Sequence, residues 1–130
     1  MGAYPDLNTY SSSKTGNTHG TALAVCTGLE KEHWASRLQV STLNFDKVNL
    51  VGVRGKVDEA EQKIIRDKKI RQFTSVKKLL NFMDETKAPV HISLDVSALD
   101  PEVLNSTGDL EPGGMETEDI KAIVQHALFN

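Results

Sequence analysis

The chain has 130 residues and a mass of 14.3 kDa, and 38% of its residues are hydrophobic and 25% charged. These values are typical of a single globular domain. The formal net charge of −3, from 15 Lys and Arg against 18 Asp and Glu, provides no basic field for a phosphate backbone, so no nucleic-acid partner is expected. One cysteine, Cys26, and the absence of any run of about 18 apolar residues predict a cytoplasmic protein without a membrane partner.

The first half of the chain predicts one long polar loop and a strand–helix–strand unit. Residues 1–20 are rich in Gly, Ser, Thr, Asn and Tyr, which favours a loop, and a short helix is expected from about Gly20 to Gly28. Residues 48–53 are β-branched and apolar, so they predict a buried strand that enters a loop at Arg54. A helix over residues 58–68 and a short strand over 70–73 are expected to follow.

The second half predicts two amphipathic helices around one more strand. A helix over residues 75–86, capped by Ser75, is expected from four apolar residues at helical spacing: Val76, Leu79, Leu80 and Met83. Residues 90–96 show the best strand pattern in the chain, and a long loop over 96–115 follows. The last helix is expected from about Glu116 to Leu128, with Thr117 as a possible cap and a core face of Ile120, Ile123, Val124, Ala127 and Leu128.

Strands separated by helices predict the α/β class, with a mostly parallel sheet covered by helices on both faces in a three-layer αβα arrangement. Ligands of such sheets bind at the carboxyl ends of the strands. Asp6, expected at the end of a short strand, and Asp95, at the end of the best one, are therefore candidates for a shared metal site. Oxygen ligands suit Mn²⁺ or Mg²⁺, and the alternative is that both aspartates are solvated or cap turns.

The polar loop carries candidates for substrate binding and proton transfer. His19, near the start of the first expected helix, can shuttle protons at neutral pH, although a loop histidine is commonly a surface residue. Uncharged donors and acceptors that suit a substrate carboxylate, or that bond their own backbone instead, are Asn8, Ser13, Thr15 and Asn17.

Two motifs resemble the arginase branch of the ureohydrolase family. Residues 6–20 resemble the loop pattern DAHxDxNT followed by GNxHG, and the spacing from Asp6 to His19 fits without a gap. Residues 91–101, with 106–108 and 113–114, resemble the signature SFDVDxLDP, TG and GG. Residues 51–54 are similar to the family's strand and GxR turn, so the resemblance covers nearly the whole chain.

The resemblance implies an incomplete version of a single arginase-like domain over residues 1–130. It further implies two Mn²⁺ ions, the hydrolysis of L-arginine to L-ornithine and urea, and a homo- or hetero-oligomer, a trimer in the family. Asp6 and Asp95 match metal ligands of the family. Three further ligand positions are altered, because an aspartate, a histidine and an aspartate are expected where Gly2, Tyr4 and Ser97 stand. Little or no bound Mn²⁺ is therefore expected.

The substrate side of the resemblance is better kept. Asn8, Ser13, Thr15 and Asn17 match positions that hold the α-carboxylate of the amino acid, and His19 matches the proton shuttle. Asp58 and Glu61 resemble the acidic pair that binds the α-amino group, if one extra residue after Arg54 is allowed. The first hypothesis is an arginase-type ureohydrolase that is catalytically impaired. The alternatives are a metal-free pseudoenzyme that binds an amino acid or serves as a regulatory or structural subunit, and a truncated product without function.

Overall fold

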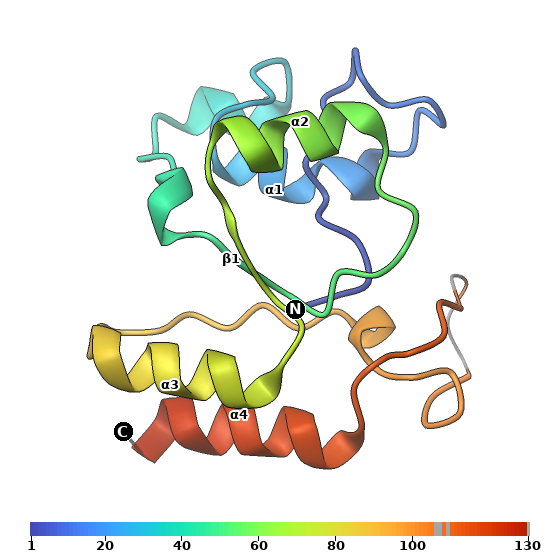
Figure 1. The fold of residues 1–130 in the computed structure, drawn as a ribbon. Coiled ribbons are helices and arrows are strands. Elements are labelled where there is room, and N and C mark those ends of the chain that lie inside the picture. Colours follow the sequence, from blue (N-terminus) through green and yellow to red (C-terminus); the bar gives the residue numbers. More distant parts are fainter. Residues whose placement is uncertain (106–107, 109, 130) are drawn as a thin grey trace. The chain divides into compact units, whose positions relative to one another are not determined.

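The computed structural model describes residues 1–105, 108 and 110–129, and these form two compact units. The α1–α2 unit comprises residues 4–49 and 56–71, and the α3–α4 unit comprises residues 1–3, 50–55 and 72–130. Figure 1 labels the helices by which we name the two units. The single domain predicted from the length stays a prediction.

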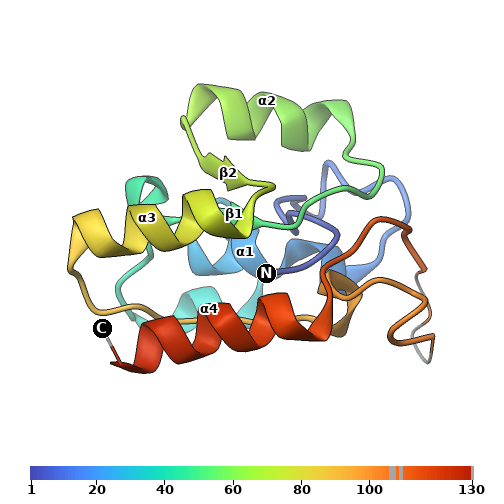
Figure 2. The ribbon, with the colours of Figure 1, turned by 60° about the horizontal axis from the view of Figure 1, so that its bottom comes forward.

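A two-stranded sheet joins the strand–helix–strand segment in the middle of the chain. Strands β1 (Asn49–Val51) and β2 (Arg71–Phe73) pair with each other, and helix α2 (Glu59–Asp67) connects them. Figure 2 shows the two strands side by side, and the Gly52 N–H extends the ladder by donating to the Phe73 carbonyl at 3.1 Å. Both strands were predicted, and they are shorter than the predicted ranges.

The α1–α2 unit begins with the polar loop and contains short helices. The 3-10 helix Thr18–Thr21 runs into α1 (Ala22–Cys26), which ends before Gly28, where a φ of +72° suits a residue without a Cβ. Asp58 caps α2 by accepting a hydrogen bond from the Glu61 N–H at 2.9 Å. Two 3-10 helices, Trp34–Leu38 and Phe45–Lys47, were not predicted. The buried apolar residues of this unit are Leu7, Ala24, Val48, Ile65 and Ile70.

Two amphipathic helices form the core of the α3–α4 unit. Helices α3 (Val76–Thr86) and α4 (Thr117–Phe129) pack against each other, and both were predicted. Ser75 caps α3 as expected, because its side chain accepts a hydrogen bond from the Lys78 N–H. The buried residues at the centre of this core are Val51, Leu79 and Ile123, and the partly buried residues around them include Val76, Leu80, Met83, Ile92 and Met115.

The predicted core face of α4 is wrong at its end. Leu128 is 71% exposed, whereas Ile123 is 1% exposed. Five residues at about 100° each separate the two side chains by about 140° around the helix. Because Ile123 marks the buried centre of the helix surface, Leu128 lies outside the face that packs.

The strand predicted over residues 90–96 is also wrong. Residues 87–95 have neither helix nor strand structure, and Asp95 instead caps a 3-10 helix, Val96–Ala98, by accepting the Ser97 N–H at 2.6 Å. Two backbone bonds link this segment to Met1: the Met1 amino group donates to the Ser93 carbonyl at 2.5 Å, and the Asp95 N–H donates to the Met1 carbonyl at 2.9 Å. A strand requires a partner along its length, and one residue of partner is too short for a ladder.

Asp6 does not end a strand either. Residues 5–9 lack regular structure, and Asp6 has a φ of +54°, in the left-handed region that no extended strand adopts. Among the described residues we find no helix with the length and the apolar character that a membrane span requires.

Candidate functional site

Three carboxylates of the α1–α2 unit hold the polar loop over residues 4–20. Glu61 accepts the Leu7 N–H at 3.0 Å, and Asp58 accepts the Asn8 side-chain amide at 2.9 Å. Glu30, which is 4% exposed, accepts the Tyr10 N–H at 2.6 Å. Bonds from N–H groups to a carboxylate are about twice as strong as bonds between neutral groups. The loop is therefore fixed by bonds from two main-chain N–H groups and one side-chain amide, and none of these bonds uses a side chain beyond Tyr10.

The three carboxylates differ in their pKa. Burial raises the pKa of Glu61, and the negative charges of Asp58 and Asp6 raise it further, whereas the bonds from the N–H groups of Leu7 and Asp58 act to lower it without reversing the shift. Partial burial also acts to raise the pKa of Asp58, but the bonds from the Glu61 N–H and the Asn8 amide outweigh it, so the pKa lies below its ordinary value. The N–H groups of Tyr10 and Glu32 lower the pKa of Glu30. Asp58 and Glu30 are thus ionised at neutral pH.

The outer part of the loop, residues 13–19, is a short network of polar groups. The Ser13 hydroxyl accepts the Gly16 N–H at 3.1 Å, and the Thr15 hydroxyl accepts the Asn17 N–H at 3.2 Å. The Asn17 amide nitrogen lies 3.2 Å from Nε2 of His19. Thr15, Asn17 and His19 are exposed. The network preorganises hydroxyl and amide groups at the surface, where a ligand has access to them.

A cavity of about 190 Å³ opens beside this network and is lined by Tyr10, Ser13, Gly16, Asn17, Thr18 and Thr21. Of the predicted substrate residues, the structure brings Ser13 and Asn17 together in its wall. Asn8 contacts Asp58 instead, and Glu61 is buried under the loop. The lining is uncharged and offers donors, which suits the carboxylate of a small molecule.

The predicted metal ligands are placed in different surroundings. Asp6 lies in the α1–α2 unit, where its carbonyl accepts the N–H groups of Leu23 and Ala24 at 3.0 and 3.1 Å. Asp95 lies in the α3–α4 unit, where one carboxylate oxygen is held by the Ser97 N–H. Within residues 1–105, 108 and 110–129, no three His, Cys, Asp or Glu side chains gather as metal ligands would.

The altered ligand positions have structural contacts of their own. Gly2 is buried, and its N–H donates to the Val51 carbonyl at 3.1 Å. The Ser97 hydroxyl accepts the Ala3 N–H at 3.1 Å. A glycine, a tyrosine and a serine supply neither a bridging carboxylate nor an imidazole. This donor set does not fit a pair of Mn²⁺ ions.

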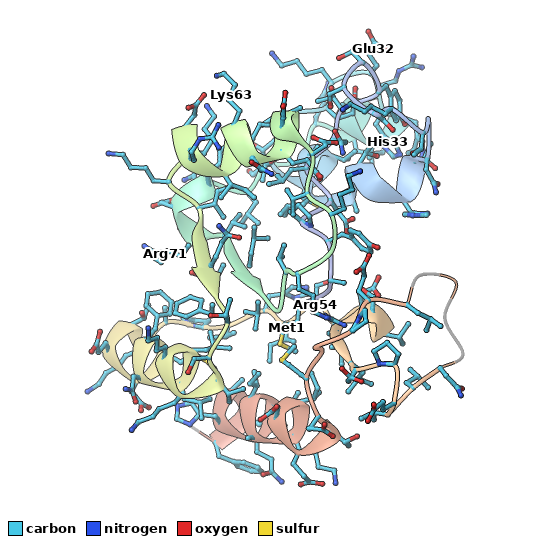
Figure 3. The ribbon with its side chains drawn as sticks, turned by 45° about the vertical axis from the view of Figure 1, so that its right-hand side comes forward. Met1, Glu32, His33, Arg54, Lys63 and Arg71 are labelled. Carbon is cyan, nitrogen blue, oxygen red and sulfur yellow. The ribbon has the colours of Figure 1, made fainter. Side chains whose placement is uncertain are left out.

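The guanidinium of Arg54 holds the loop over residues 96–115, a role that was not predicted from the sequence. Arg54 donates hydrogen bonds at 2.7 to 3.2 Å to the carbonyls of Gly52, Ser97, Leu99, Glu111 and Pro112. Figure 3 labels Arg54, whose guanidinium reaches these main-chain oxygens. The sequence signal for this role is weak, because it consists only of an arginine that follows a buried strand. Except for Gly52, the partners of Arg54 are 43 to 58 residues away in the sequence.

Asp100 completes the anchoring of the same loop from within. Its carboxylate accepts the N–H groups of Glu102, Gly113 and Gly114 at 2.8 to 3.0 Å, and these bonds, with the charge of Arg54, lower its pKa. Gly114 packs so closely that a Cβ there would lie 2.3 Å from the Asp100 nitrogen. The predicted signature therefore has a structural function here. The TG element of the signature is formed by Thr107 and Gly108. Thr107 and the preceding Ser106 lie outside the residues that the structure describes.

Fold and site together define an α/β protein whose two long loops are anchored by charged side chains. A family model described as the arginase family matches residues 1–128. The arginase of Entamoeba histolytica is 32% identical over 127 residues, which are 90% of this chain and 42% of that protein. The chain belongs to the arginase family.

Solved structures agree with this assignment. The crystal structure of the Entamoeba histolytica arginase in complex with L-ornithine gives a TM-score of 0.85 at 30% identity and covers 96% of this chain and 45% of that one. The arginase of Bacillus caldovelox gives a TM-score of 0.83 at 29% identity and covers 96% and 46%. The predicted fold class is confirmed as an incomplete arginase-like α/β domain, and the chain spans less than half the length of these relatives. The roles of the individual site residues stay predictions.

Proposed function

We propose that this chain is an arginase-family protein that binds an amino acid of the L-arginine type without hydrolysing it. One observation carries the proposal: the polar loop is built and held inside the α1–α2 unit, while the positions of the metal ligands carry groups with other bonds. Asp58 and Glu30 anchor the loop, and Ser13 and Asn17 line its cavity. Ser97 instead accepts a main-chain N–H.

The loop offers groups for both ends of an α-amino acid. The hydroxyls of Ser13 and Thr15 and the amide of Asn17 are neutral donors that suit an α-carboxylate. Asp58 is ionised, and each of its oxygens keeps a lone pair beside its present bond for an ammonium group. The main-chain N–H of Glu61 donates to Asp58 at 2.9 Å and so helps to fix the Asp58 carboxylate. The matched Entamoeba structure was solved with L-ornithine, which has the same α-carboxylate and α-amino groups.

Hydrolysis is not expected from this donor set. A bound Mn²⁺ pair would supply a hydroxide nucleophile at neutral pH. Asp6 and Asp95 remain as candidate ligands, but Gly2, Tyr4 and Ser97 do not replace the lost ones. His19, the candidate proton shuttle, is exposed and lies next to Asn17, where it serves the bound amino acid rather than a metal-bound water.

Calorimetric titration with L-arginine, L-ornithine and agmatine tests the binding. Agmatine lacks the α-carboxylate, so we expect it not to bind, and we expect the double variant Ser13→Ala with Asn17→Ala to weaken L-arginine binding at least about tenfold. Ser11→Ala is the matched control, because Ser11 lies in the same loop but outside the cavity wall. Equal binding of agmatine and L-arginine, or no binding of either, would contradict the proposal.

Metal analysis and a urea assay in added Mn²⁺ test the second half of the proposal. We expect less than stoichiometric Mn²⁺ after dialysis and no release of urea from L-arginine above background. Stoichiometric Mn²⁺ with turnover would contradict the proposal and would favour an arginase-type ureohydrolase that is not impaired.

A further inference from the structure

Tyr10 is the aromatic member of the cavity wall beside the polar loop. Among the described residues that line this cavity none is charged, and those other than Tyr10 are small or polar: Ser13, Gly16, Asn17, Thr18 and Thr21. The α-carboxylate and the α-amino group of the bound amino acid have proposed partners in Ser13, Asn17 and Asp58, whereas its side chain has none. Tyr10, which is 40% exposed, is the candidate for this contact.

Contacts inside the α1–α2 unit fix the position of Tyr10. Its N–H donates to Oε2 of Glu30 at 2.6 Å, and the Ser13 N–H donates to the Thr9 carbonyl at 2.9 Å in the turn that contains Tyr10. The His33 ring, which Figure 3 labels, lies 6.2 Å from the Tyr10 ring at an interplanar angle of 57°. Rings at this angle touch without parallel stacking, so His33 supports the Tyr10 ring without covering a face as a stacked ring would. The ring is therefore held in place before a ligand binds.

The surroundings of the Tyr10 ring favour a cation. The face of an aromatic ring is electrostatically negative and attracts a cation that lies within about 6 Å of the ring centroid. Glu30 is buried and ionised, and its bond to the Tyr10 main chain brings a full negative charge to the same part of the wall. A guanidinium group suits such a ring better than an ammonium group, because it is planar, less strongly hydrated and able to stack on the ring.

We propose that the Tyr10 ring binds the guanidinium group of the bound amino acid and so makes the cavity selective for L-arginine over amino acids of the same length with an uncharged side chain. The inference rests on the proposed function, because an α-carboxylate held by Ser13 and Asn17 places the side chain of the ligand in the cavity. The ring then recognises the cation in a wall whose described residues include no carboxylate. Tyr10 is in this account a specificity-determining residue, in addition to the polar residues that bind the α-carboxylate.

Calorimetric titration with L-arginine and L-citrulline tests this role. L-citrulline has the length and shape of L-arginine, with an uncharged ureido group in place of the guanidinium. We expect the wild type to bind L-arginine at least about threefold more tightly than L-citrulline. Tyr10→Leu should abolish this preference, and Tyr10→Phe should keep it, because phenylalanine retains the ring face. Trp34→Leu is the matched control, because Trp34 is an exposed aromatic residue of the same unit outside the cavity wall, and its loss should leave the preference intact.

The outcomes separate this inference from the proposed function. Equal binding of the two amino acids by the wild type, a preference that persists in Tyr10→Leu, or one that is lost in Trp34→Leu would overturn the role of Tyr10 while amino-acid binding stands. Binding of neither amino acid would overturn the proposed function and this inference with it. Ultraviolet difference spectra give a second readout, because L-arginine should perturb the tyrosine absorption of the wild type but not that of Tyr10→Phe, which retains Tyr4 alone. Far-UV circular dichroism confirms the fold of every variant.

Discussion

The two long loops of the chain are anchored by groups of opposite charge. The loop over residues 96–115 is held from outside by the guanidinium of Arg54, which donates to main-chain carbonyls. The loop over residues 4–20 is held from outside by the carboxylates of Glu30 and Glu61, which accept main-chain N–H groups. Both anchors act on the backbone, and they leave the loop side chains with different tasks.

The two loops therefore differ in what their motif side chains do. Those of the loop over 96–115 hold the main chain, and those of the loop over 4–20 contact solvent. At the start of the loop over 96–115 and within it, Asp95, Ser97 and Asp100 accept hydrogen bonds from main-chain N–H groups of their own unit. In the loop over 4–20, Ser13 and Asn17 line a cavity. The residues of a family signature can therefore serve to fold a loop, apart from any chemistry at the predicted ligand positions.

The largest expected effect breaks the loop over residues 96–115. Gly114→Ala would place a Cβ 2.3 Å from the Asp100 nitrogen and 2.4 Å from the Leu99 carbonyl carbon, so the backbone must move. We expect a loss of about 2–3 kcal/mol in the free energy of unfolding, measured by urea denaturation. Gly108→Ala is the matched control, because nothing lies within 4 Å of its added Cβ. Equal stability of the two variants would contradict this account of the loop.

A smaller effect is expected from releasing the loop over residues 4–20. Glu30→Ala removes the acceptor of the Tyr10 and Glu32 N–H groups. We expect the amide of Tyr10 to exchange at least about tenfold faster with deuterium, while the amides of α3 keep their rates. Glu32→Ala, a change of an exposed carboxylate two residues away, should leave the Tyr10 amide protected. Unchanged exchange in Glu30→Ala would show that other contacts hold the loop.

The smallest expected effect is a dependence of stability on pH that is caused by Glu61, one of the anchors of the loop over residues 4–20. Burial and the nearby carboxylates raise the pKa of Glu61 above its ordinary value of 4.5. Its contribution to stability is therefore complete below the unfolded pKa and is lost as the pH rises through the folded pKa. The substituted side chain of Glu61→Gln stays neutral at every pH. We therefore expect the melting temperature of Glu61→Gln, relative to that of the wild type, to increase as the pH rises above 4.5. Thermal melts across this range measure the difference.

The control for this pH dependence is Glu59→Gln in the first turn of the same helix. Glu59 is exposed, so the difference from the wild type should not vary in the same way with pH. A difference between Glu61→Gln and the wild type that falls with rising pH would show that Glu61 is stabilised as the carboxylate.

Local patterns in the sequence predicted the helices well. Apolar residues at helical spacing placed α3 and α4, and Ser75 was identified as a cap. The strand over residues 90–96 failed although its pattern was the best in the chain. A helix satisfies its own main chain, but a strand needs a partner, and alternation of side chains does not reveal whether that partner is present.

The candidate site shows the same division. The polar loop and the residue types in it were predicted from composition and from the family pattern. The roles of Glu30 and Arg54 were not predicted. Except for the bonds with Glu32 and Gly52, their contacts join residues that are 20 to 58 positions apart in the sequence. Asp58 was assigned to ligand binding alone, whereas it also caps α2 and orients Asn8. Long-range contacts of this kind leave no local signal.

The position of Trp34 has a practical consequence for spectroscopy. It is the sole tryptophan, it is 67% exposed, and its ring lies 5.2 Å from that of His33. Both tyrosines, Tyr4 and Tyr10, belong to the same α1–α2 unit. Intrinsic fluorescence therefore reports on one unit of the chain, and the α3–α4 unit can melt without changing it. A fluorescence curve that fails to coincide with far-UV circular dichroism would reveal two separate transitions.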